Sequence, residues 1–151
     1  MPSTDTVQGS YSLAIDEFFS ARHATLTEGW EEHVHYHTWR IQALFMRSPA
    51  ELKSTPVGLS ALREIVQREA GRYSDTILNR LSPFDQIPPT AENLAATLYT
   101  SIKRSLQGLA GIRLKSVTLW VHPTLSVTYS EGDGEDVDRM RKEGDRREHA
   151  A

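Results

Sequence analysis

The chain of 151 residues is 38% hydrophobic and 25% charged, which suits one globular domain with a single core rather than two domains. It has no cysteine, so disulfide bonds, thiolate metal sites and a cysteine nucleophile are excluded, and histidine and carboxylate remain as strong transition-metal ligands. The net charge of -3 comes from interleaved acids and bases, and neither a long apolar run nor a secretory leader is visible, so we expect a cytoplasmic protein that binds neither nucleic acid nor membrane.

The first predicted element is a strand that begins near Tyr11 and ends at His23. Aromatic and aliphatic residues alternate with polar ones along it, as expected for a strand with one buried face. The alternation changes phase at Phe18 and Phe19, which we interpret as a bulge.

A second strand is predicted from His33 to Phe45, after a polar connection that contains a glycine. Successive side chains of a strand point to opposite faces, so His33, His35 and His37 should share a face with Trp39.

Two helices are predicted in the middle of the chain. Residues 58–73 carry apolar side chains at helical spacing with charges between them. The second helix should begin after Thr90, a suitable N-cap, and end before Gly108, with leucine or isoleucine at every fourth position.

Two more apolar alternating runs, KSVTLWV and LSVTYS, follow around an HPT turn and predict a hairpin. Residues 131–151 are mostly charged and offer little to bury, so we expect a single domain over residues 1–130 and a disordered tail.

These elements predict an α+β fold of β-β-α-α-β-β order, with one four-stranded antiparallel sheet and both helices on one of its faces. Such a sheet has two open edges, and closure into a barrel with copies of the same chain would pair them. We therefore expect a homo-oligomer.

The repeated histidines allow two interpretations: a solvated strand face or a metal site. Histidines two positions apart on a strand have Cα atoms roughly 6.5–7 Å apart, so two imidazoles can converge on one ion. His23 ends the neighbouring strand and could supply a third. Three histidines with a fourth position open are typical of catalytic zinc.

Three segments resemble the 6-pyruvoyltetrahydropterin synthases and the bacterial 6-carboxytetrahydropterin synthases of the tunnelling fold (T-fold). They are FFSARH, VHYHTWRI and PFDQIPPTAENLA, in family order, and the resemblance extends from about Tyr11 to Tyr129. It implies a T-fold, zinc, lyase chemistry on a pterin-like substrate, and a homo-oligomer, expected to be a hexamer.

The resemblance also implies roles for individual residues. His23, His35 and His37 match the zinc ligands, and His33 is an additional imidazole. Thr90 and Glu92 match positions at the mouth of the pterin pocket, although ordinary helix capping explains a threonine there equally well.

The chain departs from the family pattern at the positions that carry the chemistry. Glu31 occupies the place of the family's proton-transferring cysteine and is our candidate general base, with His33 as an assisting group and Glu32 as its rival. Ser74 and Asp75 stand where the family has an aspartate and a histidine, so Asp75 is retained as a catalytic candidate.

The family carboxylate that binds the amino-pyrimidinone edge of the pterin is replaced by Val121. Valine forms no hydrogen bonds, and strand alternation would point the adjacent His122 to the opposite face. Three hypotheses follow: a zinc-dependent lyase on a pterin-like substrate, a zinc enzyme of the same fold acting on another small heterocycle or aldehyde, and a zinc-holding homologue without the standard activity.

Overall fold

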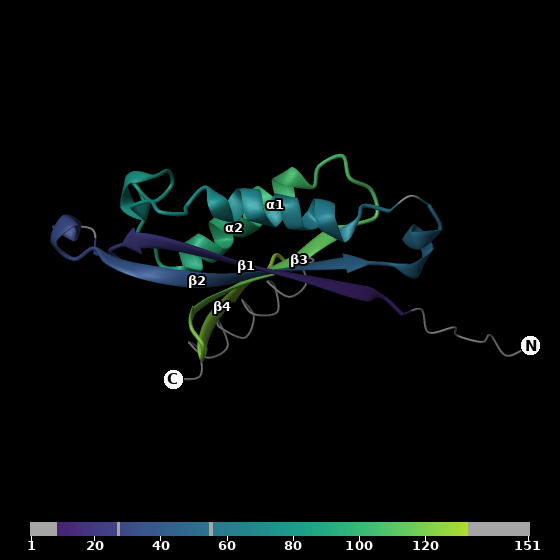
Figure 1. Cartoon of the computed structure of the whole chain (residues 1–151), viewed down its shortest axis with the longest axis horizontal. Coiled ribbons are helices and arrows are strands. Elements are labelled where there is room, and N and C mark those ends of the chain that lie inside the picture. The colour runs from purple at the N-terminus through teal and green to yellow at the C-terminus, as the bar shows by residue number, and fades with distance from the viewer. Residues whose placement is uncertain (1–8, 27, 55, 133–151) are drawn as a thin grey trace, which may run out of the picture.

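The computed structural model describes residues 9–26, 28–54 and 56–132 and confirms the predicted α+β class. Four strands form one antiparallel sheet in the order β1-β2-β3-β4: β1 (Tyr11–His23), β2 (His35–Arg47), β3 (Arg113–His122) and β4 (Leu125–Tyr129). Helices α1 (Leu59–Gly71) and α2 (Ala91–Ser105) both cover the same face of this sheet (Figure 1). Most of the predicted tail, residues 133–151, lies outside the described residues.

Strands β1 and β2 form one long hairpin without interruption. Their register runs from Tyr11 opposite Arg47 to His23 opposite His35 with no shift, so the predicted bulge in β1 is wrong. Phe19 points into the core and is 3% exposed, whereas Phe18 lies on the other face and is 67% exposed. The two neighbouring phenylalanines occupy opposite faces of a regular strand, and no extra residue is needed.

Strand β2 begins at His35 rather than at His33. A 3-10 helix, η1 (Trp30–Glu32), precedes it and starts after Gly29, whose φ of 61° lies in the left-handed region that favours glycine. The N–H group of His33 donates to the carbonyl oxygen of Trp30 at 2.9 Å and ends this turn. The alternating face of β2 therefore contains two of the three histidines.

The register shifts fall in the second half of the sheet. One lies between Leu44 and Phe45 in the pairing of β2 with β3, and the other between Trp120 and His122 in the pairing of β3 with β4. The second shift lies next to the β3–β4 turn, where alternation alone does not give the direction of a side chain.

Both helices are amphipathic, and their apolar faces form the core against the sheet. Three of the apolar positions predicted for α2 are completely buried: Leu94, Leu98 and Ile102. Burial of each such side chain stabilises the fold by about 1.5–3 kcal/mol. The Oγ1 atom of Thr90 accepts from the N–H group of Asn93 at 3.2 Å, which confirms the predicted N-cap. Among the described residues, no helix is both long and apolar enough to cross a bilayer.

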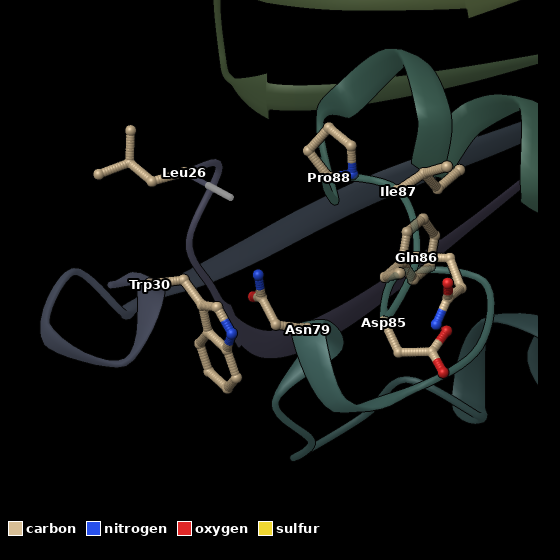
Figure 2. Close-up of a pocket in the computed structure, with 8 residues that line it drawn as sticks. Leu26, Trp30, Asn79, Asp85, Gln86, Ile87 and Pro88 are labelled. Atoms are coloured by element: carbon tan, nitrogen blue, oxygen red, sulfur yellow. The ribbon is translucent and has the colours of Figure 1, made fainter. Parts of the chain in front are cut away.

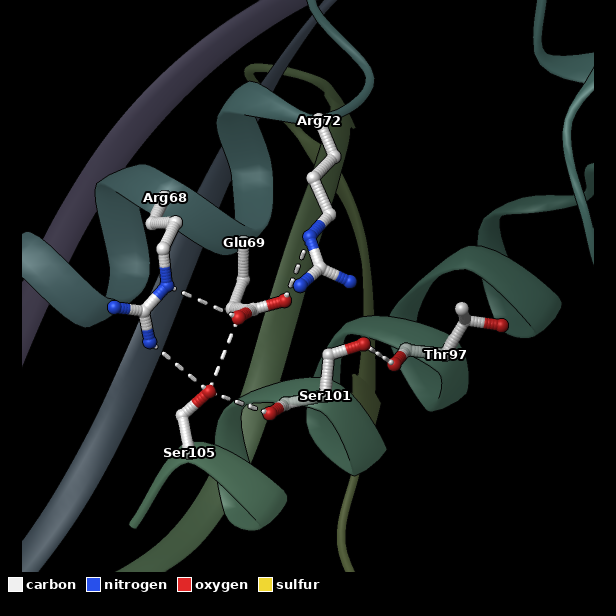
Figure 3. A network of polar contacts seen from close by, with 6 residues as sticks. All are labelled: Arg68, Glu69, Arg72, Thr97, Ser101 and Ser105. Carbon is white, nitrogen blue, oxygen red and sulfur yellow. Dashed lines mark hydrogen bonds and ion pairs between the residues drawn. The ribbon is translucent and has the colours of Figure 1, made fainter.

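A buried carboxylate joins the two helices. Glu69 of α1 is 2% exposed, and its Oε1 accepts from the hydroxyl of Ser105 of α2 at 3.0 Å (Figure 3). Arg68 and Arg72 form ion pairs with the two carboxylate oxygens at 3.5 and 3.4 Å. Removal of these partners would leave a buried charge uncompensated, so the network is expected to fix how α1 packs on α2.

Two further 3-10 helices complete the described fold: η2 (Pro49–Lys53) lies between β2 and α1, and η3 (Leu78–Arg80) lies between α1 and α2. Pairing of β1 with β2 brings the end of the first strand and the start of the second to one end of the sheet.

Candidate metal centre

Three histidines converge at the end of the sheet where β1 and β2 meet. His23 is the last residue of β1 and pairs with His35, the first residue of β2, while His37 lies two residues further on the same face. One ring nitrogen from each lies within 4.8 Å of the corresponding atoms of the other two. The ring centroids are 4.5, 5.2 and 4.8 Å apart for the pairs 23–35, 23–37 and 35–37.

Main-chain carbonyl groups orient two of these rings. The Nδ1 atom of His23 lies 2.9 Å from the carbonyl oxygen of Pro89, and Nδ1 of His35 lies 3.3 Å from that of His33. A carbonyl oxygen can only accept, so each Nδ1 carries the proton and Nε2 keeps the lone pair. Metal-binding histidines usually donate the other ring N–H in this way.

The Nε2 atom of His23 is the feature of the cluster that best fits a cation site. It is buried and has no hydrogen-bond partner among the residues that the structure describes. Buried polar atoms without a partner are rare in folded proteins and call for an explanation. A divalent cation at the centre of the three rings would supply the missing contact.

Trp39 forms the apolar floor of the cluster. Its ring centroid lies 4.9 Å from that of His23 and 5.4 Å from that of His37. Trp39 is 1% exposed and stacks on Phe19 at 5.2 Å, so the floor is fixed by the core itself.

Burial and neighbouring imidazoles favour the neutral form of two of the three rings, His23 and His37. Burial lowers the pKa of His23 below 6.5, and the neighbouring imidazoles of His35 and His37 lower it further, against the opposing effect of the Pro89 hydrogen bond. Burial likewise lowers the pKa of His37, with contributions from His35 and His122. Both rings are therefore neutral at pH 7 and have a lone pair for a metal ion.

The proposed proton-transfer residues lie outside this cluster. Glu31 and Glu32 are exposed in η1, so within one chain neither carboxylate is shielded from water. His33 is also exposed, and its contact with the cluster is its carbonyl group. Asp75 is exposed with a φ of 58°, and its main-chain N–H donates to Ser20 at 2.7 Å.

The predicted substrate-binding residues are spread over two elements. Thr90 is half-buried and caps α2, whereas Glu92 is exposed in the first turn of that helix. Val121 is half-buried and packs against the core. His122 is exposed, and it makes the smallest of the contributions that lower the pKa of His37.

A small cavity lies next to the segments that contact His23 and Ala24, and Figure 2 shows the residues that line it. It has a volume of about 120 Å³ and is lined by Leu26, Trp30, Asn79 and residues 84–88. Pro88 and Asn79 connect it to the cluster, because Pro89 holds the His23 ring and Asn79 binds the main chain of Ala24. Small-molecule sites usually measure 300–1,000 Å³, so this cavity holds only part of such a ligand.

A second cavity of about 280 Å³ lies over the open face of the sheet. Thr38, Arg40, Trp120 and residues 121–123 line it together with Phe18. Val121 thus borders a cavity in which the polar side chains are those of a threonine, an arginine and a histidine.

The family model described as 6-pyruvoyl tetrahydropterin synthase matches residues 12–132 of this chain. The 6-pyruvoyl tetrahydropterin synthase of Caenorhabditis elegans superimposes with a TM-score of 0.71 at 16% identity, covering 83% of this chain and 98% of that one. The 6-pyruvoyl tetrahydropterin synthase of Plasmodium vivax superimposes with a TM-score of 0.65 at 13% identity, covering 82% of this chain and 99% of that one. No curated protein matches this chain significantly.

Two further solved structures are similar. The uncharacterized protein WS1659 of Wolinella succinogenes has a TM-score of 0.62 at 13% identity, covering 82% of this chain and 99% of its own. A catalytic-residue mutant of the Plasmodium vivax enzyme, with glutamate replaced by alanine, has 0.61 at 11% identity, covering 82% and 99%. At these identities the structural similarity establishes the fold.

Proposed function

This chain belongs to the 6-pyruvoyl tetrahydropterin synthase family, and from that premise we propose that it is a zinc-dependent lyase acting on the side chain of a pterin-like substrate. The observation that carries the proposal is the convergence of His23, His35 and His37, with the buried Nε2 of His23 unpartnered within the described part of the chain.

Zinc fits this donor set because it binds neutral imidazole nitrogens and is commonly held by three histidines in catalytic sites. When bound, it supplies a Lewis acid with one coordination position open to substrate. The protein's contribution is to keep His23 and His37 neutral through burial and to fix the rings through Pro89, His33 and the Trp39 floor.

We assign the proton-transfer role to Glu31, with His33 assisting and Asp75 as a further candidate. Glu31 lies in the turn that leads into β2, and His33 binds the ring of His35 through its carbonyl group. The Plasmodium vivax relative with a mutated catalytic glutamate supports a carboxylate in this role. A positioned carboxylate contributes roughly 10²–10⁴-fold as a general base.

The substrate ring would lie toward Thr90, Glu92 and Val121. The N-terminus of α2 offers free N–H groups next to Pro89, whose carbonyl oxygen contacts a metal ligand. This adjacency supports a substrate that reaches from the metal to the start of α2.

We also propose a homo-oligomer in which copies of the sheet close a barrel; the family resemblance favours a hexamer. The sheet order leaves β1 and β4 as edge strands. Phe18 and Tyr36, on its open face, are 67% and 61% exposed. Residues this apolar are expected to be covered by a partner, and that partner could also bury Glu31.

Zinc content and turnover of a reduced pterin test this function. Purified protein should contain about one zinc ion per chain and cleave or rearrange the side chain of dihydroneopterin triphosphate. Glu31→Gln should lower turnover at least about 100-fold, and Glu32→Gln in the same turn is the matched control. Equal effects of the two substitutions would contradict the role of Glu31.

Val121 favours a second candidate, an enzyme of the same fold acting on a different small heterocycle. An aliphatic side chain cannot bind an amino-pyrimidinone edge, and each unpaired buried group would cost about 1–3 kcal/mol. Val121→Glu decides between the candidates: it should tighten pterin binding if the pterin ring lies here. Pterin binding by the unmodified chain without turnover would favour the third hypothesis, a zinc-holding homologue without the standard activity.

A further inference from the structure

The segment between the two helices covers the outer edge of β1 next to the metal centre. Asp75 donates its N–H to the carbonyl oxygen of Ser20 at 2.7 Å, and Arg22 donates to the carbonyl oxygen of Thr76 at 2.9 Å. Arg22 and Ile77 form a parallel bridge. Main-chain hydrogen bonds therefore hold β1 at Ser20 and Arg22, two alternate positions that face this edge.

The next alternate position, Ala24, is held by a side chain. The Oδ1 atom of Asn79 accepts from the N–H group of Ala24 at 2.9 Å, and Nδ2 of Asn79 donates to the carbonyl oxygen of Ala24 at 2.8 Å. Ala24 is 1% exposed and Asn79 is 8% exposed. One amide group thus satisfies both main-chain groups of a buried residue that water does not reach.

The place of this contact in the chain gives it a consequence for the metal centre. Ala24 directly follows His23, and the pairing of β1 with β2 ends at His23 opposite His35. Beyond that pair, the two hydrogen bonds of Asn79 hold the main chain directly after the end of β1. Leu78, which is completely buried, anchors Asn79 in turn.

We propose that Asn79 is a positioning residue for the metal centre, holding the main chain from which His23 projects; the inference rests on the proposed zinc site. Two restraints then act on His23: the Asn79 amide holds the main chain of the next residue, Ala24, and the Pro89 carbonyl holds the His23 ring. Figure 2 shows Asn79 between Trp30 and residues 85–88, on the wall of the cavity beside the centre. Loss of the amide would leave Ala24 with two unpaired buried groups, and the end of β1 would have to open to hydrate them.

Zinc affinity measured in the folded protein tests this role. Asn79→Leu keeps the approximate volume and removes both hydrogen bonds, and it should weaken zinc binding by about tenfold or more, as loss of outer-shell support typically does. Asn79→Ala leaves room for water and should cause a smaller loss. Thr76→Val is the matched control, because it removes a hydrogen bond to Tyr73 in the same segment without touching Ala24.

The measurements are zinc dissociation constants from competition with a chromophoric chelator, the visible spectrum of the Co²⁺ form, and the Tm of the metal-free protein. Asn79→Leu should weaken affinity and change the Co²⁺ spectrum, while Thr76→Val lowers Tm with affinity kept within about twofold. Unchanged affinity in Asn79→Leu, or an equal loss in Thr76→Val, would overturn the inference. If Asn79→Leu does not fold, Asn79→Ala decides by the same criteria. Absence of zinc binding in the unmodified chain would instead refute the zinc site itself.

Discussion

The Nδ1 atom of His23 lies 2.9 Å from the carbonyl oxygen of Pro89, 66 positions along the chain. This contact joins the end of β1 to the residue that precedes the N-cap of α2. It explains why the PPTAEN segment lies beside the histidines in space: its second proline orients one of their rings. The start of α2 therefore helps to support the histidine cluster.

The three histidines should be individually necessary for zinc binding. Replacing His23, His35 or His37 with alanine removes a nitrogen donor from the cluster and should lower zinc content, measured by elemental analysis after gentle purification. His33→Ala is the control, because its imidazole lies outside the cluster and its carbonyl group remains. Full zinc content in all three cluster variants would refute the site.

The metal-free protein should lose stability as the pH falls below 6.5. The pKa of His23 and that of His37 are lowered in the folded state, so the unfolded chain takes up protons first. Above the unfolded value of 6.5 both states are neutral at these rings; below it, protonation favours unfolding until the folded pKa is passed. Urea unfolding of chelator-treated protein at about pH 7.5 and about pH 5.5 should show this loss.

A variant carrying both His23→Gln and His37→Gln serves as the control for this pH effect, since it lacks the two titrating rings. Its free energy of unfolding should change less over the same interval. An identical pH dependence in the two proteins would assign the effect to other groups.

Substitution of Thr90 separates helix capping from substrate contact. Thr90→Val removes the oxygen that accepts from Asn93 and should lower the free energy of unfolding by about 1 kcal/mol. Thr90→Ser keeps the acceptor oxygen and should retain most of the free energy of unfolding that Thr90→Val loses. If the hydroxyl has no role beyond capping, the KM of both variants stays unchanged once the protein is folded; a raised KM in Thr90→Val alone would place Thr90 in contact with substrate.

The carboxylate between the helices should couple α1 to α2. Ser105→Ala removes the hydroxyl that donates to Glu69 and should destabilise the fold by about 1 kcal/mol. Glu69→Ala should lower the free energy of unfolding by about 1–3 kcal/mol. The loss stays in this range because the arginines that pair with Glu69 are largely exposed and screened by solvent. A double-mutant cycle on urea unfolding tests the coupling, and strictly additive losses would show that the contact contributes nothing.

The sequence alone was sufficient to predict the class of the fold, its element order and the N-cap of α2. These depend on local periodicity: a spacing of two along the strands, and a leucine or isoleucine at every fourth position from Leu94 of α2. The approach of His23 to His35 and His37 also followed from the sequence, because adjacent antiparallel strands place the end of one beside the start of the next.

Only the tertiary structure decided what supports those histidines. The contacts of the Pro89 carbonyl with His23 and of the Asn79 amide with Ala24 join groups far apart in the chain, and main-chain donors and acceptors leave no trace in residue type. The same is true of the strand irregularities: the sequence suggested one at Phe18, and the structure has them at Leu44 and Trp120. Register and hydrogen-bond partners are set by packing across the whole sheet, whereas a sequence pattern records only which face each side chain prefers.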